Sequence, residues 1–204
     1  ELSVGPATGQ PVARMIADGH EIAAHGRTNS ESQAGLAPAA ERALVVAARD
    51  RIAAATGRPP AGWLGPWLAQ TVNTPDLRAE SGFRYVLDYA ADDQPMWLET
   101  RRGRLLALPY SQEINDSVAV IGRRAGADAF ADMIVDQVEE MRRPATERPL
   151  VFGLALHANI MGQPFRLRHL RRALAHLKTF ADEIWITRAG TVADAVHAAP
   201  ASFD

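Results

Sequence analysis

The sequence contains no cysteine, which excludes disulfides and thiolate zinc sites and fits both the cytosol and the periplasm. It has no run of five like charges, and its net charge of −2 argues against a nucleic-acid surface. No apolar stretch approaches the ~20 residues of a membrane span. No signal peptide is visible, which favours a cytoplasmic location. We therefore expect a partner that is neither nucleic acid nor membrane.

The chain has enough apolar residues to fold around a core, since 47% of its 204 residues are hydrophobic. A length of this order predicts one large domain or a split one. The first residues are ELSVG rather than a methionine, and they are typical of a strand that is already under way. We therefore expect further sequence before Glu1. The oligomeric state is left open, with a homo-oligomer among the alternatives.

Strand and helix patterns alternate along the chain. Helices are expected over 11–18, 39–55, 74–82, 128–141, 166–178 and 191–197, with Thr74 as a hydroxyl cap before Pro75. Strands are expected over 21–25, 62–64, 83–88, 96–100, 104–108, 150–156 and 183–187, with a remnant at 2–4. This order predicts an α/β fold, either an open parallel sheet or a barrel. Because a full (β/α) barrel needs ~250 residues, a barrel of about seven strands would be distorted or incomplete.

Polar residues fall at the ends of three expected strands, namely His25, Asp88 and His157. Because parallel strands deliver their carboxyl ends to one edge, we expect these side chains to meet at a shared rim. The unperturbed imidazole pKa of ~6.5 suits His157 to proton transfer. The alternative is a structural histidine that hydrogen-bonds a neighbouring loop.

His25 is a tentative metal ligand. The residue four positions later, where a second histidine would complete a metal pair, is Asn29. Catalytic zinc usually takes three protein ligands from His, Asp, Glu or Cys, whereas an amide oxygen suits calcium better. The residues therefore favour no cofactor over a divalent metal such as zinc.

The stretch LPYSQEIND is a second source of candidate groups. Glu113 and Asp116 flank Asn115 just after an expected strand, and Tyr110 is close by. Carboxylates beside amide and phenol groups could bind a polar ligand or supply a general base. An ordinary polar loop has the same composition.

Two tryptophans, Trp63 and Trp67, bracket Gly65-Pro66. Exposed tryptophans stack on sugar or heterocycle faces and buried ones belong to the core, and we favour the core for one of the two. Asp93 and its neighbour lie in a turn, where carboxylates are most often solvated or capping groups.

Several stretches together resemble a known family. They are GHEIAAHG, GWLGPWLAQTVNTPDLRAESGFRYVLD, DDQP, LPYSQEIND and LALHANIMGQPFRLRHLRRALAHL. The chain resembles, from about Asp18 to Val196, the polysaccharide deacetylases of the NodB type, carbohydrate esterase family four in the broad sense. The nearest branch contains cofactor-independent allantoinases. This resemblance implies one deacetylase-like domain over 1–204, incomplete at its N-terminus, and a distorted, incomplete (β/α) barrel.

The resemblance also implies roles for individual residues. Family deacetylases remove N-acetyl groups with a divalent metal, held by an early aspartate motif and two histidines at i and i+4. His25 matches the first histidine and Asn29 replaces the second, while the aspartate motif would precede Glu1. His157 matches the histidine of the late Leu-x-Leu-His motif. Asp88 matches the aspartate at a strand end that supports the family's site.

The resemblance further implies a hydrolase of a non-peptide carbon–nitrogen bond, acting on an N-acetylated sugar or a similar small amide. His157 would be the acid or oxyanion partner, with Glu113 or Asp88 as base, and His25 would orient water or substrate. An allantoinase-like hydrolase of a small cyclic ureide is one alternative, and a catalytically inactive ligand-binding member is another. The expected substrate contacts are Trp63, Trp67, Asp93, Asn115 and Gln163.

Overall fold

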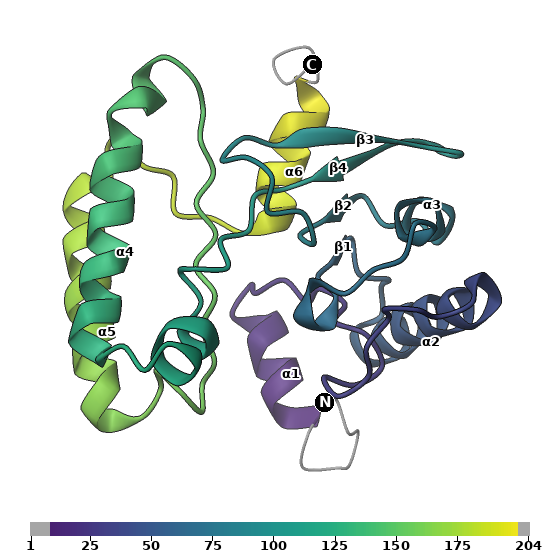
Figure 1. Cartoon of the computed structure of the whole chain (residues 1–204), viewed down its shortest axis with the longest axis horizontal. Coiled ribbons are helices and arrows are strands. Elements are labelled where there is room, and N and C mark those ends of the chain that lie inside the picture. The colour runs from purple at the N-terminus through teal and green to yellow at the C-terminus, as the bar shows by residue number, and fades with distance from the viewer. Residues whose placement is uncertain (1–8, 200–204) are drawn as a thin grey trace. The chain divides into compact units, whose positions relative to one another are not determined.

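The structure is a computed structural model that describes residues 9–199 (Figure 1). The chain divides into two compact units. The first unit comprises 1–89, 95–108 and 187–204, and the second comprises 90–94 and 109–186. The described residues form helices and a mixed sheet, which confirms the α/β fold. The strand remnant expected at 2–4 lies outside the described residues.

The sheet of the first unit has four strands in the order β1 (Gly62–Trp63), β2 (Tyr85–Val86), β4 (Gly103–Ala107) and β3 (Met96–Thr100). β1, β2 and β4 are parallel, while β3 and β4 form the antiparallel hairpin that the sequence predicts. Ala24 adds an isolated parallel bridge to Trp63. The residues that follow Ala24, β1 and β2 are therefore delivered to one edge of this sheet.

The described residues of the first unit form the α-helices α1 (Gly9–Ala17), α2 (Pro38–Thr56), α3 (Thr74–Glu80) and α6 (Ala189–Ala198), and the short turn η1 (Pro66–Leu68). α2 begins at a proline and ends at Gly57, whose φ of 79° is the left-handed conformation that glycine adopts without strain. Its buried face packs in a core with β1, β2 and β4; this face comprises Leu44, Val45, Ala48 and Ile52. No helix within 9–199 is both long and apolar enough to cross a bilayer.

Gly62 lies opposite Tyr85 in the β1–β2 pair, and it leaves room for the tyrosine ring. A Cβ at this position would lie 2.0 Å from the Tyr85 ring. The next residue, Trp63, is fully buried and meets Phe83 edge to face, with ring centroids 5.3 Å apart. The sheet core therefore depends on a glycine and an aromatic cluster at its first strand.

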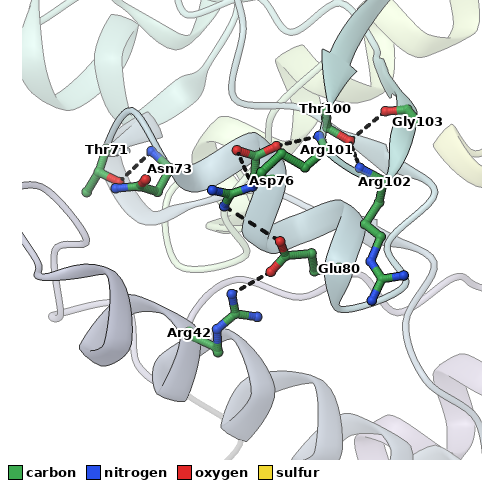
Figure 2. A network of polar contacts seen from close by, with 9 residues as sticks. All are labelled: Arg42, Thr71, Asn73, Asp76, Glu80, Thr100, Arg101, Arg102 and Gly103. Carbon is green, nitrogen blue, oxygen red and sulfur yellow. Dashed lines mark hydrogen bonds and ion pairs between the residues drawn. The ribbon is translucent and has the colours of Figure 1, made fainter.

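A polar network joins the β3–β4 turn to α3 and α2, as Figure 2 shows. The backbone N–H of Arg101 donates to Asp76 at 2.7 Å, and its guanidinium lies 3.1 Å from the same carboxylate. Arg101 also lies 3.6 Å from Glu80, which pairs with Arg42 at 2.5 Å. Inside the turn, the Thr100 hydroxyl donates to the carbonyl of Gly103 at 2.5 Å.

The second unit is built on two helices that pack along each other, α4 (Ala127–Arg142) and α5 (Pro164–Leu177) (Figure 1). Short helical turns accompany them: η2 (Ser117–Gly122), η3 (Pro144–Thr146) and η4 (Lys178–Phe180). The core between these helices includes Phe130, Ile134, Met161, Leu170 and Ala173.

Two strands expected in this unit do not form. Segment 150–156 is extended, but only Ala155 pairs, in an isolated parallel bridge to Asn115, and 183–187 has no strand. Val151 hydrogen-bonds Asp93 and Ala155 hydrogen-bonds Ile114, so the backbone bonds of this segment go to two separate places and build no ladder. Segment 21–25 likewise pairs only at Ala24. The described residues thus hold four strands, and the barrel of about seven is not confirmed.

Candidate active site

His157 and Asp116 form a close polar pair in the second unit, with Asp116 fully buried. Each comes one or two residues after the Asn115–Ala155 bridge, which brings two segments 41 residues apart together. The His157 Nδ1 atom lies 2.6 Å from Asp116 Oδ1, and the His157 backbone N–H donates to Oδ2 at 2.8 Å. The Asp116 side chain is 0% exposed, whereas the His157 side chain is 44% exposed.

This geometry fixes the proton on the imidazole. An ionised carboxylate only accepts hydrogen bonds, so Nδ1 of His157 carries the hydrogen that Asp116 binds. The lone pair of the neutral ring is then on Nε2. Asp116 also accepts the backbone N–H of Met161 at 3.4 Å, which secures the turn after His157. A half-exposed imidazole held in one tautomer by a buried carboxylate can accept and return a proton.

Asn115 serves the structure of this loop. It is 8% exposed. Its amide nitrogen donates to the Tyr110 hydroxyl at 3.0 Å, and its oxygen accepts the backbone N–H and hydroxyl of Ser117 at 2.9 and 2.7 Å. The amide of Asn115 is buried and bonded within this loop, and its substrate contact stays a prediction.

A cavity of about 360 Å³ lies in the same unit. Its lining includes two of the predicted site residues, Asp93 and Glu113, together with Tyr110. Glu113 is exposed and lies 3.8 Å from Arg123, a loose ion pair. Gln163, the residue before α5, is exposed and donates weakly to its own segment, so it is not part of this lining.

In the first unit, a single peptide group lies between His25 and Asp88. Its N–H, on Gly65, donates to Asp88 Oδ1 at 2.5 Å. Its carbonyl, on Leu64, lies 2.5 Å from His25 Nδ1 and accepts the hydrogen of that nitrogen. The other ring nitrogen, Nε2, lies 2.9 Å from the side-chain oxygen of Asn29.

The residues around His25 do not fit a zinc ion. Within 9–199, no three or more His, Cys, Asp or Glu side chains gather where they could hold a metal. The Nε2 atom of His25, the one left for a ligand by the Leu64 contact, faces the Asn29 carboxamide instead. Three such ligands are the usual requirement for catalytic zinc.

Asp88 is 4% exposed, and its Oδ2 atom is buried without a hydrogen-bond partner. Burial raises its pKa to about 6, against the opposing effects of the Gly65 N–H and of Arg78 and His25. A general base must reach the water it activates, and this carboxylate is enclosed. Asp88 holds the Leu64–Gly65 peptide from within the fold, and its role as a base stays a prediction.

The two tryptophans have different environments. Trp63 is 0% exposed and belongs to the core, and its substrate contact stays a prediction. Trp67 is 67% exposed, and both it and Leu68 have positive φ, 55° and 53°. Residues other than glycine adopt this conformation at a cost, and such strain gathers at functional sites.

Sequence reasoning had named Asp116 only as a neighbour of Asn115 and had not selected it as a site residue. No local sequence pattern selects it, because the Asn115–Ala155 bridge that brings it to His157 joins two distant segments. The convergence of His25 and His157 at one rim stays a prediction.

No family model matches the chain. A peptidoglycan deacetylase of Helicobacter pylori is 21% identical over 207 residues, which cover 85% of this chain and 70% of that protein. The crystal structure of PuuE allantoinase superposes with a TM-score of 0.85 at 28% identity, covering 94% of this chain and 63% of that one. A probable polysaccharide deacetylase from Pseudomonas aeruginosa PAO1 superposes with a TM-score of 0.86 at 26% identity, covering 95% and 65%. The chain thus spans less than two thirds of both solved chains.

Proposed function

We propose that this chain, which is similar to polysaccharide deacetylases in sequence and fold, hydrolyses the carbon–nitrogen bond of an N-acetylated sugar or a similar small amide. The observation that carries the proposal is the half-exposed His157, held by the fully buried Asp116. The similarity to a peptidoglycan deacetylase and to two solved hydrolase folds supports the reaction class.

In this reaction His157 moves one proton. Its Nε2 takes a proton from water while the water oxygen forms a bond to the amide carbon. The same proton passes to the amide nitrogen as the carbon–nitrogen bond breaks, and a carboxylic acid and an amine are released. Asp116 stays ionised and stabilises the imidazolium that forms between the two steps. General acid–base catalysis of this kind contributes about 10²–10⁴-fold to the rate.

Each of the other predicted residues keeps a proposed role of its own. Glu113 is the exposed carboxylate of the second unit and remains the alternative base, since it lines the cavity there with Asp93. Trp67 offers an exposed indole for stacking on a sugar face. His25 orients water or substrate together with Asn29, whose side chain lies 2.9 Å from its Nε2 atom, and Gln163 supplies an exposed amide.

A ureide hydrolase is the second candidate, for two reasons. The fold is similar to that of PuuE allantoinase, and the His25–Asn29 pair does not fit a zinc site. A cyclic ureide contains the same amide-type bond, so the proton path through His157 is unchanged.

We also propose that residues 1–204 belong to one deacetylase-like domain with an incomplete (β/α) barrel of about seven strands. The parallel pairing of Ala24, β1, β2 and β4 supports this arrangement. So does the likeness in fold to the two solved chains.

The test is a substrate panel of N-acetylglucosamine oligomers and allantoin, read out as acetate release and ureide loss. The wild-type chain is compared with His157→Ala and with a control on α5, His169→Gln. We expect turnover of one substrate class, lost in His157→Ala and kept in the control. Binding without turnover of any panel member would contradict the proposal and indicate an inactive ligand-binding member.

A further inference from the structure

The loop that follows β1, residues 64–74, is anchored at both ends by buried carboxylates. At its start, the Gly65 N–H donates to Asp88 at 2.5 Å. At its end, the hydroxyls of Thr71 and Thr74 donate to Glu41 at 2.6 and 2.5 Å. Asp88 is 4% exposed and Glu41 is 0% exposed. The strained, exposed Trp67 lies between these two anchors.

Two buried negative charges in one unit require compensation, because the cost of removing an unpaired charge from water is several kcal/mol. Arg78 of α3 is 0% exposed and is the single cationic side chain among the buried polar residues of the described part of the chain. Its electrostatic partners are Asp88, Glu41 and the hydroxyl of Tyr89. Asp88 in turn also interacts with His25.

The position of Arg78 is set by its neighbours. Its guanidinium lies 3.6 Å from the centroid of the Trp63 ring, and Nη2 donates to the side-chain oxygen of Gln33. Its Nε and Nη1 atoms are buried and have no hydrogen-bond partner, and the Asp88 Oδ2 atom is in the same condition. Arg78 and Asp88 interact electrostatically although no hydrogen bond joins them, so Arg78 compensates this carboxylate by its charge.

We propose that Arg78 is a positioning residue, the shared counter-charge of Asp88 and Glu41, which fixes the 64–74 loop. Through that loop it sets the Leu64 carbonyl that holds His25 and the backbone that presents Trp67. Its effect on turnover rests on the proposed function, whereas its effect on the loop does not.

A packing role alone would make a different prediction. Methionine fills much of the volume of arginine, so Arg78→Met would be tolerated if Arg78 only covered the Trp63 ring. As a counter-charge, Arg78 cannot be replaced by methionine, since both carboxylates would be left buried and uncompensated. In the double variant, Asp88 is neutral as well, so the start of the loop no longer carries an uncompensated charge. Its end, held by the still-charged Glu41, stays destabilised.

The experiment is amide hydrogen exchange over 64–74 in the full chain. The variants are Arg78→Met, Arg78→Lys and Arg78→Met/Asp88→Asn, with Arg42→Met of the surface network as control. In Arg78→Met we expect exchange in the loop to rise roughly 10–100-fold, the loss of a charged hydrogen-bond anchor. Arg78→Lys should show a smaller rise because the charge is kept, and the control should match the wild type.

Unchanged loop exchange in folded Arg78→Met, or an equal rise in Arg42→Met, would overturn the inference. If Arg78→Met alone does not fold, Asp88→Asn is compared with the double variant. In the Asp88→Asn background, loss of Arg78 should raise amide exchange at the Thr71–Thr74 end, where Glu41 remains, and leave exchange at Gly65 unchanged. Unchanged exchange at both ends would overturn the inference. If the wild type shows no turnover while the variants show this exchange pattern, the proposed function is rejected and the role of Arg78 in the loop stands.

Discussion

Asp88 and His25 hold one peptide group from opposite sides. The Gly65 N–H of that group donates to Asp88, and its Leu64 carbonyl accepts from His25, each at 2.5 Å. Hydrogen bonds in such a chain polarise one another, so the charge of Asp88 strengthens the bond that orients the imidazole. The enclosed carboxylate therefore contributes to the site through the backbone and not through contact with a substrate.

Asp88 should make the protein less stable as the pH rises through about 6. Burial raises its pKa from 3.8 to about 6, so the folded state holds a proton that the unfolded state has released. This contribution to stability is fully present below about pH 3.8 and is lost as the pH rises through about 6. At about 1.36 kcal/mol per unit, the loss is about 3 kcal/mol.

Urea unfolding of the wild type and of Asp88→Asn between pH 3 and 7 measures this effect. The wild type should lose about 3 kcal/mol more than Asp88→Asn over that range. The exposed Asp136→Asn on α4 is the control and should follow the wild type. Parallel curves for the wild type and Asp88→Asn would show that Asp88 is ionised normally.

Trp67→Gly should separate stability from substrate binding. Glycine relieves the cost of a positive φ, about 1–2 kcal/mol, but loses more backbone entropy on folding. We therefore expect a free energy of unfolding that is unchanged or about 1 kcal/mol higher, together with a KM raised roughly fivefold to tenfold by the loss of stacking. Trp185→Ala, at another exposed tryptophan, is the control. A destabilised variant with an unchanged KM would reject the strain and the stacking together.

Glu80→Gln should weaken the network of Figure 2. Glu80 is 17% exposed and lies between Arg42 and Arg101. Removing its charge should cost about 0.5–1 kcal/mol of unfolding free energy, less at high salt because such pairs are screened. The matched control is Asp132→Asn, which removes the more exposed pair with Arg172 in the second unit. If Glu80→Gln and Asp132→Asn lose the same small unfolding free energy at low and at high salt, the network stabilises the protein no more than an isolated surface ion pair.

Local patterns predicted much of the fold. The hairpin of β3 and β4 matches its prediction, with β4 shifted by one residue, and α2, α4, α5 and α6 lie within two residues of theirs. Proline at the start of α2 and Gly57 after it each act on the adjacent helix turn, so the sequence alone predicts both ends of this helix. Thr74 was predicted as a cap, but Asn73 precedes the helix without a side-chain cap bond, and the Thr74 hydroxyl binds Glu41.

The remaining features depend on pairings between distant segments. Asp116 reaches His157 because one bridge joins residues 40 positions apart, and no local pattern specifies that register. The apolar run 150–156 is typical of a strand, yet its backbone bonds at separate places. The sequence also does not predict that Arg78 and Glu41 are buried, since charged residues on helices are usually exposed.

The most direct test of the account is the rate of amide hydrolysis in His157→Ala, Asp116→Asn and the double variant, on the substrate that the panel identifies. Each single change should lower kcat by about 10²–10⁴-fold, because each removes the oriented proton carrier. The double variant should be no slower than His157→Ala, since residues that act as a unit are not additive. A wild-type rate in Asp116→Asn, or losses that multiply in the double variant, would contradict the claim that these two residues form the catalytic pair.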